Sequence, residues 1–182
     1  ADLDVDGDVD VVVAMENDDA VLKLSNDSMG NFTRSSVAVG DGPTRVLTGD
    51  VNGDFLPDVV VSNSGDDSVS VLVNDGAGGF TRSNLATGDQ PVGMTLGDLD
   101  IDGDQDLVVA NVGDDTASIF HNDGDGNFTL TQTLSLSATP GEVALQDTDA
   151  DGKMDVVVTH PSGNGISVLA QGASSFSVTT DT

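Results

Sequence analysis

The stretch Asp98-Leu-Asp-Ile-Asp-Gly-Asp-Gln-Asp106 decides the fold of this chain, together with the apolar run Leu107-Val-Val-Ala110 that follows it. Carboxylates at positions 1, 3, 5 and 9 of this nine-residue frame would repel one another strongly unless a cation lay between them. A hard divalent cation is the simplest partner for such a set of oxygen ligands. The short Val-rich run predicts a buried strand.

The same frame occurs four times, which makes this a repeat protein. The frames cover residues 2–10, 50–58, 98–106 and 147–155, so their first residues are 48, 48 and 49 positions apart. We expect one domain over residues 1–182, with repeats at approximately 1–42, 43–90, 91–139 and 140–182.

Each repeat has the same order of strand signals around its frame. Val-rich runs follow the frames at residues 11–14, 59–62, 107–110 and 156–159, and alternating strands follow these at 20–24, 69–73, 117–120 and 166–169. A hairpin signal then leads to strands that begin at Phe32, Phe80, Phe128 and Phe176. A further strand precedes each of the last three frames, at residues 44–48, 92–96 and 142–145. No helix is predicted.

Four short antiparallel strands per repeat predict an all-β fold, a β-propeller built of four-stranded blades. Only Ala1 precedes the first frame, so the first repeat lacks its innermost strand. We therefore expect the four repeats to be part of a larger propeller, or the first blade to be completed by another chain or segment.

The frames are the predicted metal sites, with about four Ca²⁺ ions, one per repeat. Calcium takes six to eight oxygen ligands from carboxylates, backbone carbonyls and water. Positions 1, 3, 5 and 9 would supply side chains, and position 7, whose residues share no chemistry, would supply its backbone carbonyl. The candidate ligands are Asp2, Asp4, Asp6, Asp8 and Asp10; Asp50, Asn52, Asp54, Leu56 and Asp58; Asp98, Asp100, Asp102, Asp104 and Asp106; and Asp147, Asp149, Asp151, Lys153 and Asp155.

The second frame departs from the others, because it carries Phe55 at position 6 and its glycine, Gly53, at position 4. The other frames have glycine at position 6, which permits a sharp turn. An EF-hand is excluded, since it needs Glu at position 12 and all four frames have Val there. Dockerin-type repeats continue into a helix, and thrombospondin-type repeats need cysteine, which this chain lacks. Mg²⁺ fits less well because it keeps its waters. Acidic turns without metal remain the alternative.

The frames, the strand order and the hairpin motif Asn-Asp-Gly-x-Gly-x-Phe resemble the FG-GAP/VCBS repeat family, over essentially the whole chain. Integrin α-subunit heads have the same type of loop. The resemblance implies a β-propeller, often seven-bladed, on secreted or cell-surface proteins, where calcium is structural and the role is adhesion or ligand recognition.

The composition is strongly acidic, with a net charge of −27. Seventeen of the thirty aspartates fall inside the frames, which concentrates the charge where ligands are needed; salt adaptation is an alternative source of the others. Such a chain should repel nucleic acid and anionic lipid, and it has no apolar run long enough to insert into a membrane.

No catalytic constellation is evident, and we expect the chain not to be an enzyme. We interpret His121 and His160 as surface residues, and the abundant Ser and Thr as residues of turns and outward strand faces. The predicted function is a secreted or cell-surface module that binds a protein or carbohydrate ligand. The alternatives are an accessory propeller of a polysaccharide-degrading enzyme and a self-assembling subunit of an extracellular filament or coat.

Overall fold

The computed structural model describes residues 1–163, 165–172 and 175–181, so the end of the fourth predicted repeat, Thr182, lies outside the described residues. The strands are Val11–Met15 (β1), Ala20–Asn26 (β2), Phe32–Ala38 (β3), Pro43–Gly49 (β4), Asp58–Asn63 (β5), Ser68–Asn74 (β6), Phe80–Ala86 (β7), Pro91–Gly97 (β8), Asp106–Asn111 (β9), Thr116–Asn122 (β10), Phe128–Ser135 (β11), Val143–Gln146 (β12), Asp155–His160 (β13), Gly165–Gln171 (β14) and Phe176–Asp181 (β15).

The strands form four antiparallel sheets, which confirms the predicted all-β class. The sheets are β1-β2-β3, β4-β5-β6-β7, β8-β9-β10-β11 and β12-β13-β14-β15. The first sheet has three strands among the described residues, and the carbonyl of Ala1 accepts a hydrogen bond from the Asp10 amide at 2.8 Å. A short 3-10 helix, Glu16–Asp18 (η1), lies where no helix was predicted. No helix in the described residues is long and apolar enough to cross a membrane.

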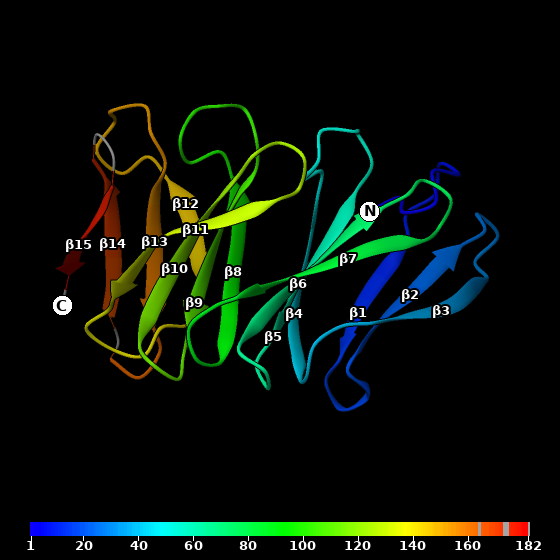
Figure 1. The fold of residues 1–182 in the computed structure, drawn as a ribbon, viewed down its shortest axis with the longest axis horizontal. Coiled ribbons are helices and arrows are strands. Elements are labelled where there is room, and N and C mark those ends of the chain that lie inside the picture. Colours follow the sequence, from blue (N-terminus) through cyan, green and yellow to red (C-terminus); the bar gives the residue numbers. More distant parts are fainter. Residues whose placement is uncertain (164, 173–174, 182) are drawn as a thin grey trace.

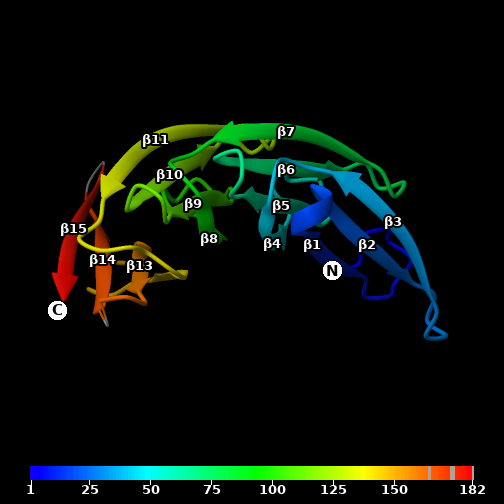
Figure 2. The same ribbon diagram turned by 90° about the horizontal axis from the view of Figure 1, so that it is seen from below.

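The sheets stand side by side along an arc, as the blades of a propeller do (Figure 2). Strands β1, β4, β8 and β12 contact one another in succession on the concave side, and β3, β7, β11 and β15 lie on the convex side. The sheets do not close into a ring. All four frames lie at the same edge of the arc, the upper edge in Figure 1.

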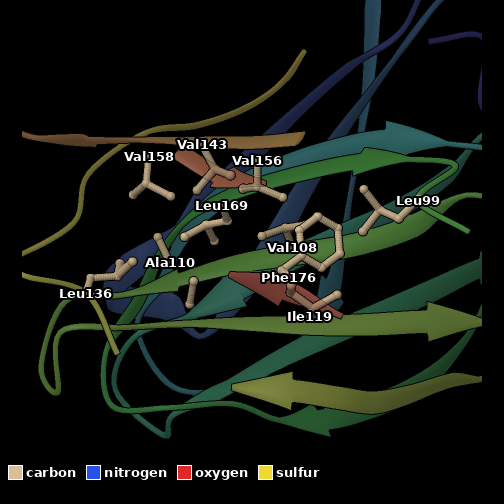
Figure 3. Close-up of a cluster of buried hydrophobic side chains, with 11 residues drawn as sticks. Leu99, Val108, Ala110, Ile119, Leu136, Val143, Val156, Val158, Leu169 and Phe176 are labelled. Carbon is tan, nitrogen blue, oxygen red and sulfur yellow. The ribbon is translucent and has the colours of Figure 1, made fainter. Parts of the chain in front are cut away.

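The apolar core lies between successive sheets rather than within one sheet. Side chains of a strand alternate between the two faces of its sheet. Each interface is therefore built from the two faces that neighbouring blades turn toward each other. Between the third and fourth sheets, Val108, Ala110 and Ile119 pack against Val156, Val158 and Leu169 (Figure 3). Strands β5 and β9 are buried along their whole length, since each has a sheet on both sides.

The face of the first sheet that points away from the second sheet, here called its backward face, carries apolar side chains as the other sheets do. No sheet covers this face among the described residues. Val11 and Val13 of β1 are 42% and 40% exposed, whereas their counterparts Val59 and Val61 are 1% and 0% exposed. The apolar repeat pattern therefore continues onto a surface that this part of the chain leaves open.

One irregularity explains the unequal frame spacing. In β11 the pairing shifts from Ile119–Gln132 to Phe120–Leu130, so Thr131 is an extra residue in a β-bulge. The corresponding pairs β2–β3 and β6–β7 run in continuous register. The insertion in the third repeat thus accounts for the interval of 49 residues between Asp98 and Asp147.

Candidate metal sites

Each frame is a tight loop with two residues in the left-handed region. Position 4 is left-handed at Val5, Gly53, Ile101 and Ala150, with φ of 60°, 74°, 67° and 63°. Position 6 is left-handed at Gly7, Phe55, Gly103 and Gly152, with φ of 95°, 67°, 101° and 89°. The second frame therefore keeps the loop conformation although its glycine is at the other position. Each frame places glycine at one of the two strained positions and a larger residue at the other.

Backbone amides hold the carboxylates of positions 1 and 5 in the loop. The position 1 carboxylate accepts a hydrogen bond from the position 6 amide in all four frames, for example Asp98 from Gly103 at 3.1 Å. The position 5 carboxylate accepts one from the position 7 amide, for example Asp102 from Asp104 at 2.9 Å. These amides thus fix the carboxylates of positions 1 and 5 on each loop.

Carboxylates converge in three of the frames. Oxygen atoms that lie within 4.8 Å of one another come from Asp2, Asp4 and Asp6; from Asp98, Asp100 and Asp102; and from Asp147, Asp149 and Asp155. Two frame carboxylate oxygens, Oδ1 of Asp4 and Oδ1 of Asp147, are buried and have no hydrogen-bond partner among the described residues. A buried oxygen without a partner is costly. These oxygen-only donor sets therefore fit a hard cation such as Ca²⁺.

The second frame is arranged differently because Asn52 replaces a carboxylate. The Asn52 amide donates to Asp54 Oδ2 at 2.8 Å, and its Oδ1 accepts from the Asp54 amide at 3.2 Å. A hydrogen bond here replaces a repulsion between two carboxylates. We expect this frame to need a cation least.

The aspartate at position 9 has a structural role that sequence reasoning missed. Asp106 accepts hydrogen bonds from the amides of Leu99, at 2.8 Å, and Asn122, at 2.9 Å. The same pair of bonds joins each frame to the end of the second strand after it, through Asp10, Asp58 and Asp155. Their contribution to a metal site, through remaining lone pairs, stays a prediction.

The pKa values of these aspartates reflect burial and local bonds. Burial raises the pKa of Asp58 and of Asp106, although backbone amides partly oppose it. Burial would also raise the pKa of Asp155, but hydrogen bonds from the Thr148 hydroxyl and the Gln171 amide bring it below its ordinary value. Desolvation and the neighbouring carboxylates of Asp102 and Asp98 raise the pKa of Asp104. The neighbouring carboxylates of the third frame therefore oppose the ionisation of Asp104.

Position 7 side chains contact the hairpin between the second and third strands after the frame. Asp8 accepts from the Ser28 hydroxyl, and Lys153 donates to the Gly172 carbonyl at 2.9 Å. Leu56 and Asp104 lie against Gly76 and Gly124. This agrees with the expectation that position 7 offers an ion only its carbonyl, which stays a prediction.

Many aspartates outside the frames have local structural roles. Asp27, Asp75 and Asp123 accept two backbone amides each across the hairpins at 27–31, 75–79 and 123–127. Hydrogen bonds from the Asn31 and Asn127 side chains are the main reason that the pKa values of Asp27 and Asp123 are lowered. For Asp75 the main cause of the lowered pKa is the Ala77 amide. Turn formation, as well as any salt adaptation, thus explains part of the acidity.

The prediction that His160 is a surface residue is wrong. His160 is 3% exposed, and its Nε2 lies 2.7 Å from the Ser167 hydroxyl. It occupies the place of Asn63 and Asn111, whose amides donate to Ser70 and Ser118 at 3.0 Å. Because these serines are also buried, the assignment of serines to turns and outward faces fails here. His121 is about one-third exposed, in contact with Asp100.

A second feature that the sequence analysis did not predict is a set of hydrogen bonds between successive repeats. The Asn74 amide donates to the carbonyls of Leu3, at 2.9 Å, and Pro57, at 3.1 Å, and Asn122 bonds Val51 and Gln105 in the same way. Gln171 reaches the carbonyl of Leu99. The recurrence of Asn or Gln at the end of this strand was the signal in the sequence that could have revealed it.

A comparison with protein families agrees with these features. The model of the FG-GAP-like repeat matches three overlapping segments, residues 2–61, 50–109 and 98–158. Each match begins at the start of one frame and extends through the next. A comparison with curated protein sequences found no significant match.

Solved structures share the fold at low sequence identity. BBS1N, crystallised in complex with ARL6DN, has a TM-score of 0.65 at 17% identity, over 99% of this chain and 54% of that one. A protein from Lactobacillus plantarum has a TM-score of 0.71 at 21% identity, over 95% and 52%. The V. cholerae biofilm matrix protein Bap1 has a TM-score of 0.64 at 20% identity, over 98% and 26%. The chain thus spans about half, or less, of the length of these structures.

Proposed function

The chain belongs to the family of FG-GAP-like repeats, and on this premise we propose that it is a calcium-stabilised part of an extracellular β-propeller that acts as a binding or adhesion module. The observation that carries the proposal is the convergence of frame carboxylates at one edge of the arc, with buried oxygens that lack a partner among the described residues. An adhesion module needs a rigid surface, and rigid frames provide one.

The residues of the chain would hold the ions as follows. Positions 1, 3 and 5 offer carboxylate or amide oxygens, and backbone amides already fix positions 1 and 5 in the loop. The buried aspartate at position 9 joins the loop to the neighbouring strand. A bound cation would supply the positive charge that opposes carboxylate repulsion. Ordering the frame would then order the edge of each blade.

The extracellular location that we propose follows from the calcium concentration that the sites need. Extracellular modules of this type bind calcium with dissociation constants of about 10⁻⁴ to 10⁻³ M. Such sites are filled at the calcium concentration outside cells and stay empty at that of the cytosol. The similarity of fold to a biofilm matrix protein agrees with an extracellular place. A protein or carbohydrate ligand is the partner we propose, and no catalytic activity is part of the proposal.

A structural role in an extracellular matrix or filament is the second candidate. It is favoured by the apolar backward face of the first sheet, where Val11 and Val13 are exposed, and by the fold shared with Bap1. The accessory propeller of a polysaccharide-degrading enzyme stays a prediction from the sequence.

The test of the calcium proposal is the rise in melting temperature between chelator and millimolar calcium. Each ion that binds only the folded chain adds RT ln(1 + [Ca²⁺]/Kd), about 1.4 kcal/mol at ten times Kd. We expect a rise of about 3 °C per filled site at that concentration. Asp102→Ala should reduce this rise, because it removes a converging oxygen from the third frame.

The matched control is Asp89→Ala, in the connection before β8. Asp89 is exposed, and its carboxylate has no hydrogen-bond or ion-pair partner in the described part of the chain. This variant should keep the full calcium-dependent rise. An equal rise in both variants and the wild-type chain would show that Asp102 holds no calcium, and the absence of a rise in all three would show that the frames are acidic turns without a metal role.

A further inference from the structure

The third repeat departs from the repeat pattern in two places, and these meet in space. His121 stands where the other repeats have Ser25, Val73 and Ala170. The bulge at Thr131 also has no counterpart in the equivalent pairs β2–β3, β6–β7 and β14–β15. Both residues line a cavity of about 250 Å³ between the third and fourth blades. Bulges often re-aim side chains beside functional sites.

A mixed nitrogen and oxygen donor set lies beside the cavity, and two of its members, His121 and Asp100, line the cavity wall. Nδ1 of His121 lies 3.3 Å from Oδ2 of Asp100, and each side chain is 34% exposed. A carboxylate oxygen of Asp106 completes the set, with all three ligand atoms within 4.8 Å of one another. His121 comes from β10, Asp106 begins β9, and Asp100 comes from the frame, so rigid strands position two of the three.

We propose that His121, Asp100 and Asp106 bind a zinc ion, with the remaining coordination position open to the cavity. Imidazole nitrogen favours zinc and similar transition metals, whereas an oxygen-only frame favours calcium. Zinc sites with three protein ligands and one open position are common, at ligand distances of about 2.0–2.2 Å. Tetrahedral ligands at those distances are roughly 3.3–3.6 Å apart, which agrees with the 3.3 Å between His121 and Asp100.

The hydrogen bonds of Asp106 are compatible with this role. Its carboxylate accepts the amides of Leu99 and Asn122, and each carboxylate oxygen has a second lone pair. These amides orient the carboxylate as outer-shell partners do in metal sites. On the opposite side of the cavity, the fourth blade contributes Lys153 and Phe176. The open position therefore faces a partly polar space that admits water or a small anion.

The zinc proposal is distinct from the calcium proposal, although Asp100 and Asp106 are also candidate calcium ligands. The test is a calorimetric titration of the full chain with Zn²⁺ in millimolar calcium, which keeps the frames supplied. The wild-type chain should bind one zinc ion more tightly than any others. His121→Ser, which introduces the residue of the first repeat, should weaken that binding at least about tenfold, since even outer-shell changes cost about 10-fold to 100-fold.

Two variants distinguish zinc bound at His121 from zinc bound at the second histidine or in a calcium frame. His160→Asn introduces the residue found at the matching place of the second and third repeats and should leave zinc binding unchanged. Asp102→Asn lies in the third frame outside the zinc set, so it should weaken calcium binding and retain zinc. Zinc binding that is unchanged in His121→Ser, or lost equally in Asp102→Asn, would overturn the proposal.

A spectroscopic measurement tests the wild-type chain directly. The imidazole signals of His121, assigned by their absence in His121→Ser, should shift in the NMR spectrum on addition of one equivalent of Zn²⁺. Those of His160 should stay in place, since this ring is buried against Ser167. Unshifted His121 signals at a bound stoichiometry of one would also overturn the proposal.

Discussion

At the scale of single residues, backbone strain is concentrated in the frames. Val5 and Ile101 are β-branched residues in the left-handed region, and Phe55 is bulky; they are 55%, 64% and 92% exposed. A left-handed conformation costs a residue with a Cβ about 1–2 kcal/mol. Because these side chains are exposed, their burial offsets little of this cost. The hydrogen bonds within the frame must therefore stabilise the loop conformation.

A pair of variants in the first frame tests this strain. Val5→Gly should raise the free energy of unfolding by about 1 kcal/mol, because glycine adopts a φ of +60° without a steric penalty. Val9→Gly should lower it by about 0.5–1 kcal/mol, because Val9 is not left-handed and glycine adds freedom to the unfolded chain. Urea denaturation of the calcium-loaded protein measures both. Shifts in the same direction would contradict the strain argument.

At the scale of elements, one polar contact recurs between successive blades and is set into an apolar interface. Position 2 of the frame is the attachment point: its side chain is buried in the first three repeats, and its carbonyl accepts an amide from the next blade. In the fourth repeat the corresponding residue, Thr148, is exposed. Position 2 is therefore apolar and buried wherever the described residues place a following blade against it.

The contact made by Asn74 can be tested against that of Asn26. Asn74→Ala should lower the free energy of unfolding by about 1–3 kcal/mol, because it leaves the buried carbonyl of Leu3 without its donor. Asn26→Ala should cost less, since Asn26 is partly exposed and its side chain reaches only the Val9 carbonyl, at 3.4 Å. The measurement is chemical denaturation in calcium. Equal costs would show that the contact between blades adds nothing.

At the scale of the whole molecule, negative charge gathers at both edges of the arc. The chain has 32 acidic and 5 basic residues. The frames occupy one edge; at the other, the neighbouring carboxylate of Asp19 raises the pKa of Asp41. Self-repulsion of this size opposes the compact state, and it is screened by salt over a Debye length of about 10 Å at 0.1 M.

Salt should therefore stabilise the metal-free protein. In chelator, an increase of NaCl from about 0.01 to 0.5 M shortens the screening length roughly sevenfold, from about 30 Å to about 4 Å, and should raise the melting temperature by several degrees. In millimolar calcium the same increase should have a smaller effect, because bound ions already offset repulsion in the frames. Scanning calorimetry with both buffers compares the two. A salt effect that is independent of calcium would contradict this account.

Much of the fold could be predicted because its signals are local and repeated. Strand order follows from Val-rich runs, the frames and the phenylalanines that begin β3, β7, β11 and β15. The loop of the second frame was harder to predict. Positions 4 and 6 are both left-handed in every frame, so the same backbone conformation forms whether the glycine stands at position 4 or at position 6. His160 was misread because its neighbour Ser167 belongs to the adjacent strand and is buried with it.

The sequence by itself determined the repeats, the four strand types and the positions of the acidic frames, because alternation and turn chemistry act over a few residues. The tertiary structure decided the role of each carboxylate: Asp106 holds two backbone amides, whereas Asp98, Asp100 and Asp102 converge. It also decided the contacts between repeats, such as Asn122 to Val51, and the cavity beside His121. These depend on how neighbouring blades stack, which brings together residues as far apart in sequence as Asn122 and Val51, 71 positions, and that stacking is set by the packing of their apolar faces.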